Sequence, residues 1–173
     1  MTQIMKCYYV QSCSGEAYRR FVEIMLREST AFSVVSFMTQ KNARLPKVIK
    51  EFKEAISALK IYSADTNHWP GMISFDQRSC YRLFAFRSDP RALDQLRMVN
   101  SLYEWDYPDH PLDLCFYKNG YVLFASCAHE MWNKLYTQDE GLIKELSDAG
   151  MVITREKDIP DEELYYDKKL AKV

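Results

Sequence analysis

The sequence predicts an α+β fold, with a single domain in which helices pack against a mixed β-sheet. Segments rich in β-branched and aromatic residues alternate along the chain with segments whose apolar residues recur at helical spacing. The dipeptide Asn119-Gly120 lies between two apolar runs and is typical of a tight β-hairpin. Helical connections permit parallel neighbouring strands, whereas the hairpin requires an antiparallel pair, so the two together predict a mixed sheet.

The first 102 residues predict strands that alternate with helices. Ser14 can cap a first helix whose apolar face includes Phe21 and Met25. Pro46 is a favourable first residue for a second helix, and Asp89-Pro90 opens a third. The expected elements are, in chain order, a strand at 4–12, a helix at 14–28, a strand at 31–38, a helix at 46–59, a loop at 63–71, strands at 72–76 and 80–87, and a helix at 89–102.

The second part of the chain begins with a loop, because two prolines exclude a continuous helix over residues 103–111. The antiparallel hairpin is expected at about 112–126, followed by helices at 128–136 and 139–149 and a strand at 151–155. Residues 1–158 are therefore expected to form the single α+β domain. Residues 159–173 read as a charged C-terminal tail whose only anchors are Leu164, Tyr165 and Tyr166.

Composition and pattern exclude several classes of protein. No apolar run approaches the roughly 18 to 20 residues of a membrane span, and residues 1–6 lack the pattern of a secretory signal. A cytoplasmic location is expected on these grounds. The five glycines never fall into the spacing of a phosphate-binding loop or a dinucleotide fingerprint, so we expect no cofactor.

The five cysteines are spread along the chain without a Cys-x-x-Cys pair, which argues against a disulfide framework and a zinc knuckle. Cys127 and His129 are separated by one residue and could bind a metal ion only with a further ligand from a distant part of the chain. Because the chain has three histidines and no second paired motif, we expect no metal site.

Cys13 lies where the first expected strand passes into the first helix. A helix N-terminus lowers the pKa of a thiol and favours a nucleophilic thiolate. His129 follows the end of the hairpin and could act as the base, with Asp113, Glu130 or Asp109 orienting its ring. A cysteine-dependent hydrolase or transferase is therefore one candidate function. In the alternative, Cys13 is a small buried side chain and His129 closes the first turn of a helix.

Two segments resemble known proteins. The triplet Cys13-Ser14-Gly15 ahead of a helix resembles the catalytic cysteine segment of the NlpC/P60 cysteine peptidases, and residues 112–117 are similar to the strand entry before their histidine. The chain departs from that family because Ser12 replaces an acidic or amide residue and no His-Val-Gly strand follows Tyr117. The resemblance implies a thiol hydrolase. Residues 111–130 also resemble segments of small uncharacterised bacterial proteins, which implies no activity.

Charge is distributed unevenly along the chain. Residues 1–103 carry 15 Lys or Arg against 9 Asp or Glu, whereas residues 104–173 carry 8 against 15. Basic residues around the second helix could form a phosphate-binding face and so make the 41–60 region a nucleic-acid-binding module. Glu51 and Glu54 interleave with these lysines, as on a solvated helix face. The candidate nucleic-acid residues are Lys41, Arg44, Lys47, Lys50 and Lys53.

Aromatic and acidic residues gather on two expected loops, where they favour contact with another protein. In the alternative, the tryptophans fold back onto the core. The candidate partner-binding residues are Trp69, Tyr103, Glu104, Trp105, Asp106, Tyr107 and Asp109. We favour a small soluble protein, bacterial or from a phage, that binds a basic protein partner. An inhibitor, an immunity protein or an anti-defence factor would need no catalytic motif.

Overall fold

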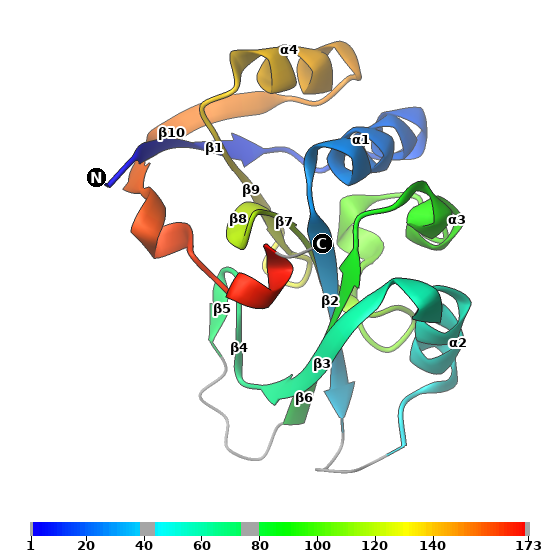
Figure 1. Cartoon of the computed structure of the whole chain (residues 1–173). Coiled ribbons are helices and arrows are strands. Elements are labelled where there is room, and N and C mark those ends of the chain that lie inside the picture. The colour runs from blue at the N-terminus through cyan, green and yellow to red at the C-terminus, as the bar shows by residue number, and fades with distance from the viewer. Residues whose placement is uncertain (1, 39–43, 74–79, 172–173) are drawn as a thin grey trace.

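The computed structural model describes residues 2–38, 44–73 and 80–171, and its centre is an eight-stranded sheet in the order β10-β1-β9-β8-β7-β2-β6-β3 (Figure 1). The strands are β1 (Ile4–Val10), β2 (Ala31–Met38), β3 (Lys60–Thr66), β6 (Cys80–Arg87), β7 (Leu112–Lys118), β8 (Tyr121–Cys127), β9 (Trp132–Thr137) and β10 (Ile153–Pro160). Short strands β4 (His68–Trp69) and β5 (Met72–Ile73) form a separate hairpin. The helices are α1 (Gly15–Glu28), α2 (Lys47–Ala55), α3 (Leu93–Leu96) and α4 (Glu140–Asp148).

The predicted α+β fold is confirmed, and so is the hairpin, which β7 and β8 form across Asn119-Gly120. Neighbouring strands of the large sheet are antiparallel in each described pair. The parallel pairs that a mixed sheet would include do not occur among the described strands. β1 and β2, which α1 connects, run in the same direction, but β9, β8 and β7 lie between them.

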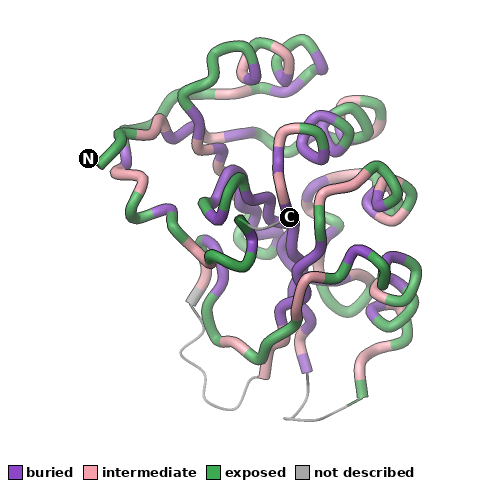
Figure 2. The backbone as a smooth tube through the Cα atoms, viewed as in Figure 1, coloured by how far each residue is buried: buried purple, intermediate pink, exposed green. Residues whose placement is uncertain are grey.

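One face of the sheet packs against all four helices and forms the larger core, which we call the helix-side core. Phe32, Phe86, Phe116 and Phe124 extend from four strands and contact Phe21 of α1 and its neighbours. Figure 2 shows that buried residues concentrate along the central strands, whereas the outer sides of the helices are exposed. Burial of these rings supplies the main driving force for folding.

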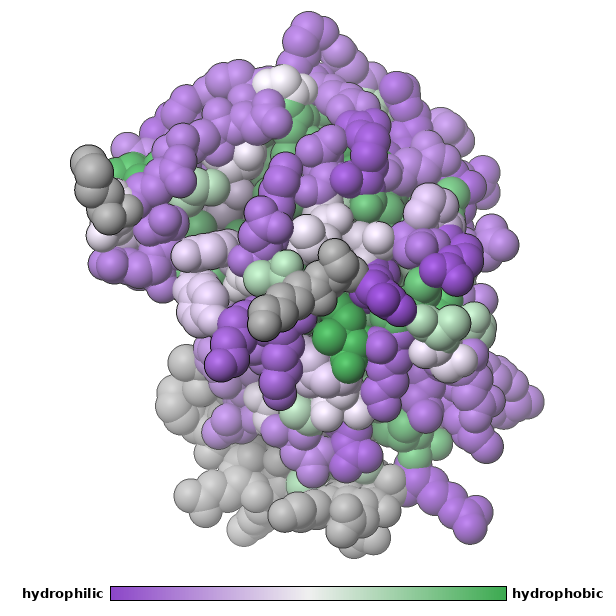
Figure 3. All heavy atoms as spheres, viewed as in Figure 1, coloured by the Kyte–Doolittle hydropathy of each residue, from purple (hydrophilic) through white to green (hydrophobic). Residues whose placement is uncertain are grey.

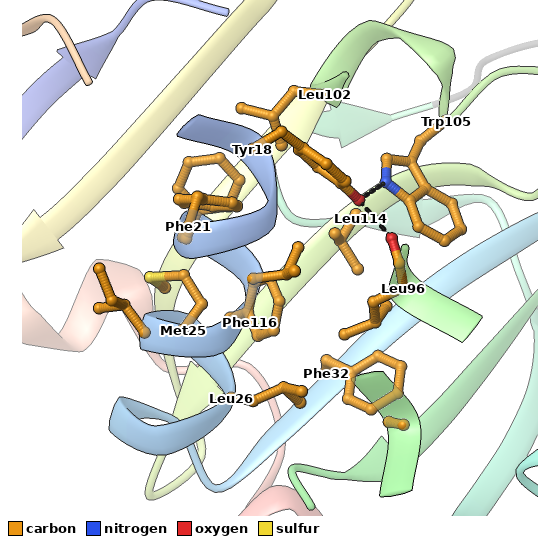
Figure 4. Close-up of a cluster of buried hydrophobic side chains, with 14 of the residues drawn as sticks. Tyr18, Phe21, Met25, Leu26, Phe32, Leu96, Leu102, Trp105, Leu114 and Phe116 are labelled. Carbon is orange, nitrogen blue, oxygen red and sulfur yellow. Dashed lines mark hydrogen bonds between the residues drawn. The ribbon is translucent and has the colours of Figure 1, made fainter. Parts of the chain in front are cut away.

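A buried hydrogen-bond pair lies inside the helix-side core (Figure 4). The Tyr18 hydroxyl of α1 donates to the Leu96 carbonyl at 2.7 Å and accepts from the Trp105 indole Nε1 at 2.9 Å. All three groups are buried, so each bond satisfies a polar atom that water cannot reach. The bonds fix α1, α3 and the loop after α3 relative to one another.

The opposite face, which we call the second face, is covered by the β4–β5 hairpin and by the C-terminal segment (Figure 1). Trp69 of β4 and Leu170 are almost fully buried against it. The Tyr166 backbone N–H donates to the Gly120 carbonyl at 2.9 Å, which attaches the segment to the hairpin turn. In Figure 3 hydrophilic side chains dominate the side that carries the C-terminal segment, and apolar side chains appear there in small separate patches.

The expected charged tail is therefore more firmly attached than its composition indicated. β10 continues to Pro160, and two short 3-10 turns follow at Asp161–Leu164 and Lys168–Leu170. Ile159 and Leu170 are buried anchors in addition to Leu164, whereas Tyr165 is half exposed.

Several of the expected elements differ in the structure. The expected loop at 63–71 is wrong, because it contains the end of β3 and the whole of β4. Of the expected strand at 72–76, β5 covers Met72–Ile73, and the remainder lies outside the described residues. The predicted helix at 128–136 is wrong, because a tight turn at 128–131 leads into β9, where Asn133, Leu135 and Thr137 alternate as buried residues with partly exposed neighbours. The second helix ends at Ala55 rather than at 59, and the edge strand β3 begins at Lys60. The third helix is only one turn long.

Replacing Tyr18 with Phe should lower the free energy of unfolding by about 1 to 3 kcal/mol, because it leaves the Trp105 indole N–H and the Leu96 carbonyl buried without their partner. Urea denaturation measures the change. Tyr165→Phe is the matched control, since Tyr165 is 49% exposed and should change stability little. Equal stability of the Tyr18→Phe variant and the wild type would contradict the proposed role of the pair.

Candidate functional site

An open pocket of about 340 Å³ lies on the second face, where the β4–β5 hairpin meets the loop before β7. Aromatic rings form much of its wall, and two carboxyl groups and an imidazole open into it. Its lining residues are Phe37, Trp69, Met72, Tyr81, Asp106, Tyr107, Leu112, Asp113 and His129. Its volume lies in the range of small-ligand pockets, and such a pocket can also accept one side chain of a protein partner.

Asp113 lies at the floor of this pocket and is 1% exposed. Its two carboxylate oxygens accept hydrogen bonds from the Trp69 indole Nε1 at 2.8 Å and from the Ala128 backbone N–H at 3.0 Å. The Asp113 backbone is left-handed, with φ of 53°, and its N–H donates to the Trp105 carbonyl at 3.1 Å. Burial raises the pKa of Asp113, although the two hydrogen bonds partly oppose that shift.

Cys127 and His129 lie beside this carboxylate, at the end of β8 and in the turn that follows. The Cys127 Sγ is 3.5 Å from His129 Nδ1 and 4.0 Å from Nε2. Oxygen, sulfur and nitrogen atoms of Asp113, Cys127 and His129 all lie within 4.8 Å of one another. Cys127 is fully buried, and burial raises the pKa of its thiol to about 12. His129 keeps 44% of its side chain exposed.

The register of the β7–β8 hairpin brings Asp113 and Cys127 together. Lys118 pairs with Tyr121 beside the turn, but a bulge between Phe116 and Tyr117 shifts the pairing by one residue. Beyond the bulge Cys115 pairs with Ala125, and two more residues of that register place Asp113 level with Cys127. Without the bulge, the register beside the turn would place Asp113 opposite Ser126.

Cys13 lies in a different environment from the one expected. It is 6% exposed within the helix-side core, whereas Asp113 and His129 line a pocket on the second face. The expectation of a lowered thiol pKa is wrong, because burial raises the pKa of Cys13 to about 12 and outweighs any effect of the α1 N-terminus. Of the expected catalytic group, the structure brings Asp113 and His129 together and places Cys13 elsewhere.

The expected partner-binding residues divide into buried and exposed groups. Trp69 and Trp105 are 2% and 0% exposed, so neither indole lies on the surface. Both are held inside by hydrogen bonds, from Trp69 to Asp113 and from Trp105 to Tyr18. Glu104, Tyr107 and Asp109 are exposed, and Tyr103 and Asp106 are partly exposed.

The basic segment forms part of α2 and the residues before it. Arg44 is exposed, and Lys41 lies outside the described residues. Lys47 pairs with Glu51 at 3.6 Å, and Lys50 lies 4.0 Å from Glu54. These pairs reduce the positive field of the helix, while Lys53 is partly exposed.

A second pocket, of about 500 Å³, lies between strand β8, the start of β1, the end of β9 and the turn that follows β10. Two carboxylates line it, and both already accept backbone hydrogen bonds. Asp139 accepts from the Leu142 N–H at the start of α4, and Asp161 accepts from the Gln3 N–H. The pocket at Asp113 is the stronger candidate site, because a buried carboxylate, a thiol and an imidazole lie within 4.8 Å of one another there.

No family model, curated protein or solved structure matches this chain. The resemblance of the Cys13 segment to NlpC/P60 peptidases stays a prediction, and so does that of residues 111–130 to small bacterial proteins. None of the helices in the described residues has both the length and the apolar character needed to cross a membrane.

Under native conditions at pH 8, alkylation of Cys13 should be slower than that of Cys80 by at least about tenfold. Cys80 is partly exposed, whereas the other four cysteines are buried. Mass spectrometry of a time course with iodoacetamide measures each site. Fastest labelling at Cys13 would restore the thiol-enzyme hypothesis.

Proposed function

We propose that this protein acts by binding a basic protein partner through an acidic aromatic surface around the pocket at Asp113. We define this surface by Tyr103, Glu104, Asp106, Tyr107, Asp109, Glu130 and Met131. The single observation that supports it is the gathering of carboxylates around an aromatic-lined pocket, in a segment, residues 103–113, without Lys or Arg. Such a field attracts a positively charged partner and opposes acidic ones.

One hydrogen bond joins two segments of this surface, and Tyr103 itself packs against the helix-side core. The Tyr103 hydroxyl donates to the Met131 carbonyl at 2.8 Å, which joins the loop after α3 to the turn before β9. Met131 is 64% exposed, and Glu130 beside it accepts from the Trp132 indole at 3.2 Å. Tyr107 packs against Phe37 at the pocket mouth, with ring centroids 5.4 Å apart. Tyr and Met are enriched at protein interfaces.

The chemistry of the thiols favours binding over catalysis. Cys13, the expected nucleophile, and Cys127, which lies beside His129, are both buried, and their pKa values are raised to about 12. Neither presents a thiolate to a substrate. The basic 41–60 region is the weaker alternative surface, because Lys47 and Lys50 face Glu51 and Glu54.

An inhibitor, an immunity protein or an anti-defence factor that covers a basic active site fits this surface. We place the protein in the cytoplasm, since its five cysteines are all free and a reducing compartment keeps thiols unpaired.

Replacing Tyr107 with Ala and Asp109 with Asn together should weaken partner binding by at least about tenfold, because it removes an exposed ring and a charge at the centre of the surface. The measurement starts from affinity capture in a lysate of the source cells, with quantitative mass spectrometry. The captured protein is then purified and titrated at low and high salt.

The matched control is the Tyr165→Ala, Asp94→Asn double variant, which removes an exposed ring and an exposed charge away from the surface. We expect it to capture the same basic protein as the wild type. A partner retained equally by both double variants, or one whose affinity does not fall as salt rises, would contradict the proposal.

A further inference from the structure

Three side chains that ligate metal ions meet at the floor of the pocket, on residues that the sequence separates. Asp113 is the second residue of β7, Cys127 ends β8 and His129 follows in the next turn. The sequence analysis expected no metal because Cys127 and His129 had no further ligand. The bulged hairpin supplies one, since it places the Asp113 carboxylate within 4.8 Å of both other ligand atoms.

The spacing of these atoms suits a tetrahedral ion. A zinc ion about 2.3 Å from sulfur and about 2.0 to 2.1 Å from nitrogen, at the tetrahedral angle, separates the two ligand atoms by about 3.6 Å. The Cys127 Sγ and His129 Nδ1 are 3.5 Å apart. Cys127 and His129 are thus already at the spacing of two zinc ligands, and the Asp113 carboxylate lies within 4.8 Å of both.

Charge balance favours a cation at this point. Asp113 and Cys127 are 1% and 0% exposed, and both bind a metal ion as anions. Among the ion pairs of the described residues none involves Asp113, so no Lys or Arg compensates its carboxylate. A divalent cation would neutralise both groups in a place where an isolated charge is costly.

The groups around the ligands hold them in position. The Trp69 indole donates to one Asp113 oxygen and the Ala128 N–H donates to the other. Each oxygen therefore keeps a further lone pair for a metal ion. The Glu130 carboxylate lies 3.9 Å from His129 Nε2, the ring nitrogen that the cluster does not use. A carboxylate that accepts a hydrogen bond from a ligating histidine fixes its tautomer and ring orientation, and Glu130 would have to move closer than 3.9 Å to do so.

We propose that Asp113, Cys127 and His129 bind a zinc ion, through a carboxylate oxygen, Sγ and Nδ1, with the fourth coordination position directed to the pocket. Carboxylate, thiolate and imidazole together suit Zn²⁺ among the common divalent ions. On binding, the Cys127 thiol passes its proton to solvent and the thiolate joins the ion. Three protein ligands and one open position are the arrangement of zinc sites that accept water or an added ligand.

This inference does not depend on partner binding. Zinc with one carboxylate, one thiolate and one neutral imidazole forms a cluster with no net charge, so Glu104, Asp106 and Asp109 still give the surface its negative field. If the protein binds zinc but no basic partner, or a basic partner but no zinc, one proposal holds and the other fails.

The test is metal titration of the purified full-length protein after chelator treatment. Elemental analysis should find one zinc per chain after gel filtration. Co²⁺ in place of Zn²⁺ should give the visible absorption of a tetrahedral ion together with a thiolate-to-cobalt charge-transfer band. His129→Ala should weaken zinc affinity by more than about 100-fold, because it removes a ligand. Glu130→Gln changes only an outer partner and should have a smaller effect, of roughly tenfold or greater.

Matched controls separate ligation from folding. His68→Ala and Cys80→Ser change a histidine and a cysteine outside the cluster and should leave zinc affinity and the cobalt spectrum unchanged. Cys127→Ser should abolish the charge-transfer band, and its circular dichroism shows whether it folds. If Cys127→Ser does not fold, His129→Ala decides alone, because that side chain is 44% exposed. Equal zinc affinity of the wild type and His129→Ala would overturn the proposal.

Discussion

The buried carboxylate of Asp113 is the interaction on which the candidate site depends. Its oxygens hold the Trp69 indole of the β4–β5 hairpin and the Ala128 N–H at the end of β8. Its own N–H is bonded to the Trp105 carbonyl. One residue thus connects three segments that are distant in sequence, and together they form the pocket floor. Loss of one of these bonds would leave a buried polar group without a partner.

The sheet explains why a site forms on this side of the molecule. Its central strands are buried on both faces, as the pattern of β2 shows, where all but one residue is buried. The helices pack against one face, whereas a short hairpin and the C-terminal segment cover the other. The pocket opens where this thinner cover meets the loop before β7. The proposed zinc ion would lie at its floor, and the acidic aromatic surface would form its rim.

Elements with strong local signals could be predicted from the sequence. The helix from Gly15, the strand from Ala31 and the Asn119-Gly120 hairpin all appear, because helical spacing, β-branched and aromatic content and turn chemistry act over a few residues. The expected Ser14 cap is wrong in one respect, since its side chain makes no capping hydrogen bond. β9 could not be predicted in this way, since Trp132–Thr137 satisfies either period and only pairing with β1 and β8 makes it a strand.

The candidate site was predictable only in part. Asp113, His129 and the pair of Cys127 with His129 were singled out, but the sequence did not predict that Asp113 joins Cys127, which depends on the bulged pairing of β7 and β8. The burial of Trp69 depends on a partner 44 positions away, so its loop context indicated a surface residue. A single-residue shift of register changes which side chains meet, and contacts between distant segments decide which indole is covered.

Hydrogen exchange of the three indole N–H groups, followed by NMR in deuterated water, tests the central role of Asp113 most directly. The Trp69 and Trp105 protons should exchange slowly, because each is buried in a hydrogen bond, while that of Trp132 should exchange fast, because it donates to the exposed Glu130. Exchange of the Trp69 proton as fast as that of Trp132 would contradict the account, since it would mean that the indole is not held by the Asp113 carboxylate.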